Sequence, residues 1–264
     1  MLPCNITIFW CLLFFIINKQ VLGQESSEVT DRIINGKDAK IGERPYQVSL
    51  QNPRHFCGGS IINHRYIVTA AHCTVGLSVS GLQIVVGTVN LKLPYEIYKA
   101  SKIIVNRQYS SKDSFKNDIA LIKVSRRIRF SNRVKAVRVP ELHLRLRPHT
   151  PVIVSGWGRL LNGTVANILQ EVLLEVTDQG KCRRAVAKKG FNLYYTQMCA
   201  DDNDNSIMSG DCNGDSGGPL TTTSGILVGI VSWSIKDPSC GSNVYPNIYT
   251  RVSEYIDWIR EHMQ

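Results

Sequence analysis

A short glycine-rich stretch of the chain combines a serine with two acidic residues. It reads Gly210-Asp211-Cys212-Asn213-Gly214-Asp215-Ser216-Gly217-Gly218-Pro219. The glycines beside Ser216 let another molecule approach the backbone closely, so the Ser216 hydroxyl is a candidate nucleophile. A serine hydroxyl is a weak nucleophile near neutral pH and needs a base, most often histidine, to take its proton. The chain must therefore supply a histidine, and an acid to orient it, elsewhere.

The order of these partners along the chain separates two classes of serine hydrolase. The stretch fits the G-x-S-x-G pattern of α/β-hydrolases, in which an acid and then a histidine follow the serine. Only 48 residues follow Ser216, and His262 is the only histidine among them, which leaves no room for the rest of that fold. Upstream lie Thr69-Ala70-Ala71-His72-Cys73 and Asn117-Asp118-Ile119-Ala120-Leu121, so the order is His72, Asp118, Ser216.

The elements that must position these residues are predicted to be short strands. Apolar and β-branched residues recur in brief alternating runs between Gly, Asn and Pro, which is typical of a many-stranded antiparallel protein. At the C-terminus, Val252, Ile256, Ile259 and Met263 follow helical spacing after a candidate cap at Ser253. We expect one terminal helix on a β body. The predicted strands are 47–50, 66–69, 83–86, 102–105, 152–154 and 227–231.

The N-terminus and the cysteines indicate a secreted protein. Residues 1–23 contain an apolar run over 6–17 and end in small residues, as a signal peptide does. The run falls short of the roughly 20 residues that span a bilayer, so we expect no membrane anchor. Without Cys4 and Cys11, six cysteines remain, which fits three disulfides. No pair of these six cysteines shows the close C-x₂₋₄-C spacing of a zinc site, so no metal is predicted.

Positive charge dominates the chain, whose formal net charge is +10. Residues 123–149 hold nine Lys or Arg against Glu141 alone, and a second cluster comprises Lys181, Arg183, Arg184, Lys188 and Lys189. We interpret both as solvated loops. The alternative is a docking surface for sulfated glycans or another polyanion. Nucleic acid and membranes are not expected partners.

Beyond these patterns, the sequence resembles the chymotrypsin/trypsin family of serine peptidases, most closely its three-disulfide invertebrate members. The resemblance implies an all-β fold of two antiparallel six-stranded β-barrels with a C-terminal helix, a monomer without cofactors, and the catalytic groups in the cleft between the barrels. Its other motifs are Arg32-Ile33-Ile34-Asn35-Gly36, Tyr46-Gln47-Val48-Ser49-Leu50, Phe56-Cys57-Gly58-Gly59-Ser60, Ser155-Gly156-Trp157-Gly158, Ser232-Trp233 and Tyr249-Thr250-Arg251-Val252.

The same resemblance assigns catalytic roles and disulfide pairs. His72 would be the general base, Asp118 would hold its tautomer, and the N–H groups of Gly214 and Ser216 would form an oxyanion hole. The apolar neighbours Ile119, Ala120 and Leu121 predict a buried Asp118 with the imidazole as its only good partner. The implied disulfides are Cys57 with Cys73, Cys182 with Cys199, and Cys212 with Cys240, although the cysteine count alone leaves other pairings open.

An activation step is implied as well. Residues 24–32 would be an activation peptide that an activating protease removes after Arg32, leaving 33–264 as the peptidase domain. The new α-amino group of Ile33 would then pair with Asp215 and order the oxyanion hole. The partners that the resemblance implies are protein and peptide substrates and protease inhibitors.

Specificity is the least determined property. By resemblance, Gly210 lies at the base of the specificity pocket, Asp211 on its wall, Ser234 and Asn247 at its mouth, and Ser232-Trp233-Ser234 on the edge that pairs with substrate backbone. Three interpretations stay open: a chymotrypsin-like pocket, which we favour; trypsin-like cleavage after Lys or Arg through Asp211; or a narrowed, elastase-like pocket in which Asn247 donates to Asp211. A non-catalytic polyanion-binding homologue is the rival function. Asn162-Gly163-Thr164 predicts a glycosylated Asn162.

Overall fold

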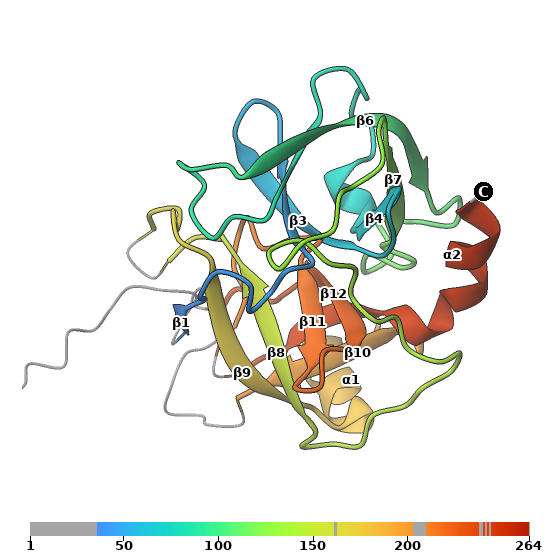
Figure 1. Ribbon diagram of the computed structural model, residues 1–264. Coiled ribbons are helices and arrows are strands. Elements are labelled where there is room, and N and C mark those ends of the chain that lie inside the picture. Colours follow the sequence, from blue (N-terminus) through green and yellow to red (C-terminus); the bar gives the residue numbers. More distant parts are fainter. Residues whose placement is uncertain are drawn as a thin grey trace, which may run out of the picture.

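The alternating segments in the first half of the chain form a closed β-barrel. The computed structural model describes residues 36–160, 163–202, 210–237, 240, 242 and 244–263. Six antiparallel strands close in the order β2-β3-β4-β7-β6-β5 (Figure 1). Predicted strands 47–50, 66–69, 83–86 and 102–105 lie within this barrel. Its strands are β2 (Gln47–Gln51), β3 (His55–Ile61), β4 (Tyr66–Thr69), β5 (Gln83–Val86), β6 (Glu96–Val105) and β7 (Ala120–Val124).

A second barrel follows along the chain. Its strands run in the order β9-β10-β13-β12-β11-β8, and pairing between β8 and β9 closes them into a ring. The short strand β1 (Lys37–Asp38) pairs with β9 outside this ring. The predicted pair of six-stranded barrels is therefore confirmed. The strands are β8 (Pro151–Gly156), β9 (Gln170–Val176), β10 (Gln197–Asp201), β11 (Pro219–Thr222), β12 (Leu227–Trp233) and β13 (Asn247–Arg251).

The two barrels share apolar core and polar contacts. Leu227 and Ile230 of β12 belong to the same buried cluster as the interior of the first barrel. Because β12 packs on both sides, all seven of its residues are buried instead of alternating with solvent. Between the barrels, Ser155 Oγ donates to Gln47 Oε1 at 2.8 Å. These contacts fix the relative position of the two halves of the cleft.

The helices differ in part from the prediction. Helix α2 (Ile256–His262) confirms the predicted terminal helix, and Ile256 and Ile259 bury against the first barrel (Figure 1). The predicted cap at Ser253 is wrong, because its hydroxyl donates to the carbonyl of Leu144 at 2.9 Å. Ser253 lies instead in a short 3-10 helix, η2 (Val252–Glu254).

A second helix was not predicted. Helix α1 (Gln179–Ala187) carries part of the second basic cluster, which is therefore helical and not a loop. Asp178 caps it by accepting from the backbone N–H of Lys181 at 2.7 Å. Only Cys182 and Val186, four residues apart, are buried, so its apolar periodicity is weak. No helix within the described ranges is long and apolar enough to cross a membrane.

Candidate active site

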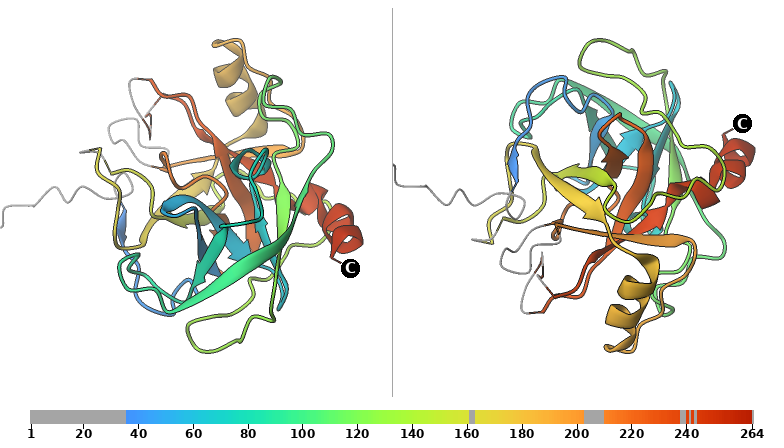
Figure 2. Two further views of the ribbon diagram at one scale, coloured as in Figure 1. Left: turned by 90° about the horizontal axis from the view of Figure 1, so that it is seen from above. Right: turned by 90° about the horizontal axis from the view of Figure 1, so that it is seen from below.

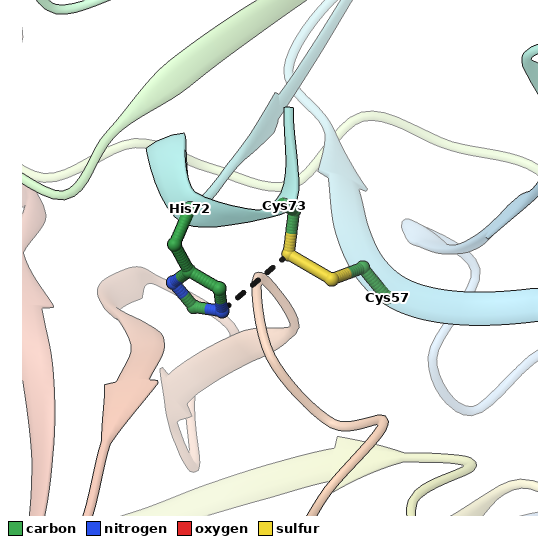
Figure 3. Close-up of side chains that lie close together, drawn as sticks. All are labelled: Cys57, His72 and Cys73. Atoms are coloured by element: carbon green, nitrogen blue, oxygen red, sulfur yellow. Dashed lines mark hydrogen bonds between the residues drawn. A yellow bond between two sulfur atoms is a disulfide. The ribbon is translucent and has the colours of Figure 1, made fainter. Parts of the chain in front are cut away.

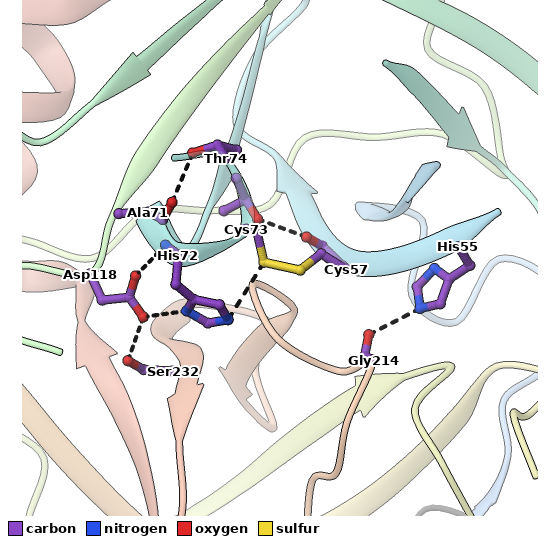
Figure 4. The surroundings of a disulfide bond; sticks show 11 residues. His55, Cys57, Ala71, His72, Cys73, Thr74, Asp118, Gly214 and Ser232 are labelled. Carbon is purple, nitrogen blue, oxygen red and sulfur yellow. Dashed lines mark hydrogen bonds and ion pairs between the residues drawn. A yellow bond between two sulfur atoms is a disulfide. The ribbon is translucent and has the colours of Figure 1, made fainter. Parts of the chain in front are cut away.

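His72 and Asp118 meet in the cleft as the sequence predicts. His72 lies on a 3-10 turn, η1 (Ala71–Cys73), directly after β4, and Asp118 lies just before β7. Pairing of β4 with β7 brings the two segments together. Nδ1 of His72 is 2.7 Å from Oδ2 of Asp118, and the His72 backbone N–H donates to Oδ1 at 2.9 Å (Figure 4). This arrangement fixes the ring with Nδ1 facing the carboxylate.

Asp118 has more partners than predicted. Its side chain is fully buried, and Ser232 Oγ donates to the same Oδ2 at 2.6 Å (Figure 4). The expectation that the imidazole is its only good partner is therefore wrong. A buried carboxylate needs several donors to replace its lost hydration. Ser232, predicted only as part of a substrate-binding edge, thus also solvates the acid beside His72.

Ser216 shares a cavity with His72. The cavity has a volume of about 380 Å³, and the half-buried Ser216 opens into it. The backbone carbonyl of Ser216 accepts the Gly58 N–H at 2.8 Å, which fastens the serine loop to the first barrel. Three aromatic residues complete this cavity, and two of them, Phe115 and Phe191, lie in no motif of the sequence that predicted a role. The lining residues are His72, Phe115, Phe191, Asp211, Cys212, Asn213, Ser216, Val231, Ser232, Trp233, Ser234 and Lys236.

The three implied disulfides are present: Cys57–Cys73, Cys182–Cys199 and Cys212–Cys240. The first ties η1, with His72, to β3. Nε2 of His72 lies 3.8 Å from Sγ of Cys73 (Figure 3). Because both sulfurs are in the disulfide, neither is a thiolate that could bind a metal ion.

A second histidine, which the sequence analysis missed, supports the loop before Ser216. His55 Nε2 lies 3.0 Å from the carbonyl oxygen of Gly214 (Figure 4). Nδ1 of the same ring lies 2.8 Å from Ser49 Oγ. Burial lowers the pKa of His55 to about 4, so the ring is neutral at pH 7. A carbonyl only accepts, so Nε2 carries the proton and Nδ1 accepts the Ser49 hydroxyl. His55 thereby fixes the Gly214 peptide, whose φ of +102° favours glycine.

This environment predicts a pH-dependent contribution to stability. The folded-state pKa of His55 lies below its ordinary value of 6.5, so its contribution is complete above pH 6.5 and is lost as the pH falls to about 4. The lost free energy of unfolding between pH 7 and pH 4 is about 3 kcal/mol. In a Ser216→Ala background, which prevents self-digestion, His55→Phe should remove this component from guanidinium unfolding curves at the two pH values. The exposed His149→Gln serves as control, and an unchanged pH dependence in His55→Phe would contradict the assignment.

Asp215 is a fully buried carboxylate of the serine loop. It accepts the N–H of Gly158 at 2.7 Å and that of Cys212 at 2.9 Å. A Cβ at Gly156 or Gly158 would collide with this carboxylate, which explains the glycines of the Ser155–Gly158 motif. Burial raises the pKa of Asp215 to about 7, and the neighbouring Asp211 adds to the shift. Among the described residues, no Lys, Arg or His side chain forms an ion pair with the Asp215 carboxylate.

The predicted pocket residues lie close together, but the hydrogen bond to Asp211 differs from the one that the elastase-like interpretation predicted. Asp211 is 3% exposed and its Oδ1 accepts the Tyr249 hydroxyl at 2.7 Å. The donor to Asp211 is thus Tyr249, and no bond from Asn247 is observed among the described residues. Burial raises the pKa of Asp211 to about 6 despite this bond. The side-chain nitrogen of Asn247 covers Gly210, since a Cβ at Gly210 would collide with it.

The predicted activation and glycosylation sites lie in other parts of the chain. Arg32, Ile33 and Asn162 lie outside the described residues, as do the signal and activation segments.

Lys236 lines the cavity although no sequence motif pointed to it, and its ammonium donates to Asn213 Oδ1. It follows the predicted Ser232-Trp233-Ser234 edge by only two residues, and that proximity was its one sequence signal.

The double barrel and its cleft define a class of serine peptidase, and comparison with known proteins agrees. The family model described as Trypsin matches residues 33–259, and the chain belongs to this family. It is 40% identical to "Chymotrypsin-2" of Vespa crabro over 87% of this chain and 99% of that protein. It is 38% identical to "Trypsin Blo t 3" of Blomia tropicalis, over 86% and 85% of the two chains. Identity to "Trypsin-1" of Astacus astacus is 36%, over 86% and 98%.

Proposed function

We propose that this protein is a secreted serine endopeptidase, made as a zymogen, that hydrolyses peptide bonds through an acyl-enzyme. The observation that carries the proposal is the 2.7 Å contact between His72 Nδ1 and Asp118 Oδ2 in the cavity that Ser216 also lines. Membership of the trypsin family supports the same reaction class. A non-catalytic homologue would have no need for a complete His, Asp and Ser set.

The chemistry would run in two halves. Ser216 Oγ attacks the scissile carbonyl carbon while His72 Nε2 takes the hydroxyl proton, and the carbonyl π electrons move onto oxygen. The N–H groups of Gly214 and Ser216 would stabilise this oxyanion. His72 then gives its proton to the leaving amine as the C–N bond breaks, which leaves an acyl-serine. Water repeats the sequence and releases the acid, and the Asp118 carboxylate stabilises the imidazolium in both halves.

Secretion and activation complete the proposal. Residues 1–23 would be removed as a signal peptide, and 24–32 after cleavage at Arg32. The family match begins at residue 33, which supports Ile33 as the first residue of the peptidase domain. The raised pKa of Asp215 supports its pairing with the new α-ammonium group, because a buried carboxylate needs a counter-charge to stay ionised. An attached glycan at Asn162 belongs to the same secretory route.

For specificity we favour a chymotrypsin-like pocket. Tyr249 already occupies one oxygen of Asp211, and the floor at Gly210 lies under the Asn247 amide. These contacts favour Asp211 as a wall residue over a free binding site for a cation. The position of Asp211 on the cavity supports the second candidate, trypsin-like cleavage after Lys or Arg. The relatives carry both names, chymotrypsin and trypsin.

A cleavage profile distinguishes the two pockets. The proprotein is cut after Arg32 and incubated with a diverse peptide library, and the new termini are sequenced. We expect cuts after aromatic and leucyl residues, with kcat/KM for such substrates changed less than about threefold in Asp211→Asn, since no charge is bound there.

Cuts after Lys or Arg, together with a loss of about 10²- to 10³-fold in Asp211→Asn, would contradict the chymotrypsin-like pocket, because removing one partner of a buried ion pair has an effect of that size. Ser234→Ala is the matched control at the same cavity. Ser234→Ala alters the mouth of the specificity pocket without altering its charge. It should therefore leave unchanged whether kcat/KM is higher for basic or for apolar substrates.

A further inference from the structure

The cavity that holds His72 and Ser216 carries an exposed positive charge at its edge. Lys236 lines this cavity, and it is also exposed to solvent. A residue that lines a cavity and also faces solvent lies at the opening. Among the described residues that line the cavity, Lys236 is the only Lys or Arg. A substrate side chain at the opening would therefore lie near an ammonium group.

The fold holds this ammonium group in place. Lys236 lies just after β12, and its Nζ donates to Oδ1 of Asn213, which belongs to the loop before Ser216. An ammonium group has three donor hydrogens, so two remain for an acceptor on the substrate. Among the described residues no carboxylate forms an ion pair with Lys236, and the neighbouring Asp237 pairs instead with Lys189 at 2.9 Å.

Asp211 is the one acidic residue among the described residues that line the cavity, and it has a different partner. It is 3% exposed, and its Oδ1 accepts the Tyr249 hydroxyl at 2.7 Å. Burial raises the pKa of Asp211 to about 6, and the attraction of Lys236 is the smallest of the effects that oppose this rise. Lys236 is therefore not the main partner of Asp211, and its charge remains available to an anion that enters the cavity.

We infer that Lys236 makes the enzyme select peptides with an acidic side chain close to the scissile bond. The inference rests on the proposed peptide hydrolysis at Ser216, and it names a determinant of specificity apart from the pocket floor at Gly210. A substrate Asp or Glu would accept from the ammonium group while the substrate backbone pairs with the proposed edge at 232–234, two residues before Lys236. A basic side chain at the same substrate position would be repelled, so the charge at the opening discriminates between peptides.

The probes are pairs of peptides that differ in one residue, Glu or Gln, placed in turn at each position near the scissile bond. The full chain, cleaved after Arg32, is assayed at about pH 8, where glutamate is ionised and lysine is protonated. At one position we expect kcat/KM of the wild type to be about threefold higher for Glu than for Gln at about 0.05 M NaCl, because an exposed ion pair has an effect of that size. The two values should become nearly equal at about 0.5 M NaCl, where salt screens the charges.

Two variants of Lys236 test the assignment, and Lys102→Gln is their matched control. Lys236→Gln should bring the ratio of the two kcat/KM values to about one, and Lys236→Glu should invert it. Lys102→Gln removes the same charge from β6 of the first barrel, where Lys102 is exposed and does not line the cavity. Figure 2 shows the green β6 and the orange-red end of β12 on different sides of the molecule. The control should therefore keep the ratio of the wild type.

Three outcomes would overturn the inference: equal kcat/KM for Glu and Gln peptides at every position in the wild type, the wild-type ratio in Lys236→Gln, or an equal loss of the ratio in Lys102→Gln. In each of them the peptides are still hydrolysed, so the catalytic proposal stands.

If the wild type hydrolyses none of the peptides, the catalytic proposal fails separately, and binding then tests Lys236. The measurement is the Kd of fluorescent Glu and Gln peptides for Ser216→Ala, with and without Lys236→Gln, by fluorescence anisotropy. Tighter binding of the Glu peptide that is lost with Lys236→Gln would support the role of Lys236, and equal Kd values for the two peptides would overturn it.

Discussion

Replacing Ser216 with alanine is expected to lower kcat/KM of the activated protein by about 10⁶-fold, the scale of loss known for serine nucleophiles in other triad enzymes. Alanine removes the oxygen that would form the proposed acyl-enzyme but keeps the backbone N–H of the proposed oxyanion hole. Ser216 is half-buried at the cavity, so alanine fits without distortion. The measurement is hydrolysis of a peptide ester or amide, together with mass spectrometry after labelling with a fluorophosphonate.

The control is Ser80→Ala, which changes an exposed serine of the first barrel and should leave activity unchanged. The fluorophosphonate should add its mass to the wild-type peptide that contains Ser216 and to none from Ser216→Ala. If Ser216→Ala hydrolyses substrate within tenfold of the wild type, Ser216 is not the nucleophile. If the wild type is neither labelled nor active after cleavage at Arg32, the non-catalytic homologue becomes the better hypothesis.

The second large effect is expected at Asp215. Its folded-state pKa of about 7 lies above the ordinary 3.8, so its stabilising contribution is present below pH 3.8 and is lost as the pH rises to about 7. The resulting cost at neutral pH is about 4 kcal/mol. An α-ammonium group at Ile33 would offset it. Cleavage after Arg32 should therefore raise Tm more at pH 7 than at pH 4.

Asp215→Asn should abolish this gain in Tm and lower kcat/KM by at least about 10²-fold, since the ammonium group would lose its buried partner. The readouts are Tm of proprotein and cleaved protein at both pH values, and activity. Arg32→Gln, which blocks cleavage, should also show no gain. Asp211→Asn is the matched control: Asp211 is also buried and bonds to Tyr249, and its removal takes away only its own smaller contribution to the raised pKa of Asp215, so this variant should keep most of the gain. Full activation of Asp215→Asn would contradict the proposed ion pair.

Local pattern and motif were enough to predict the fold class and much of the site. The alternating runs predicted β2, β4, β5 and β12 to within two residues, because period-two burial is a local property of a barrel strand. The β6 strand begins six residues earlier than predicted, since alternation continues through Tyr98 and Ala100. The motif resemblance correctly implied all three disulfides and the meeting of His72 with Asp118.

The sequence predictions failed where a residue with a clear local signal bonds to a residue far away in the chain, or where an element has too few buried residues to show a pattern. Ser253 has the residue type of a helix cap, yet its hydroxyl bonds to Leu144, which lies 109 residues away. Helix α1 escaped prediction because only two of its nine residues are buried, too few to mark a helical face. The basic run at 123–149 was interpreted as solvated loop, but Lys123 lies within β7, and Arg126 forms an ion pair with Glu96, which lies 30 residues earlier in the chain.

The order His72, Asp118, Ser216 and the surrounding motifs are enough to predict the class of chemistry, because they limit which groups can react. The environment of these groups could be seen only in the folded chain. Ser232 reaches Asp118 across 114 residues, Tyr249 reaches Asp211 across 38, and His55 reaches Gly214 across 159. These bonds exist only once two barrels have closed and packed together, because each side chain is positioned by strand pairings that no local window of sequence contains.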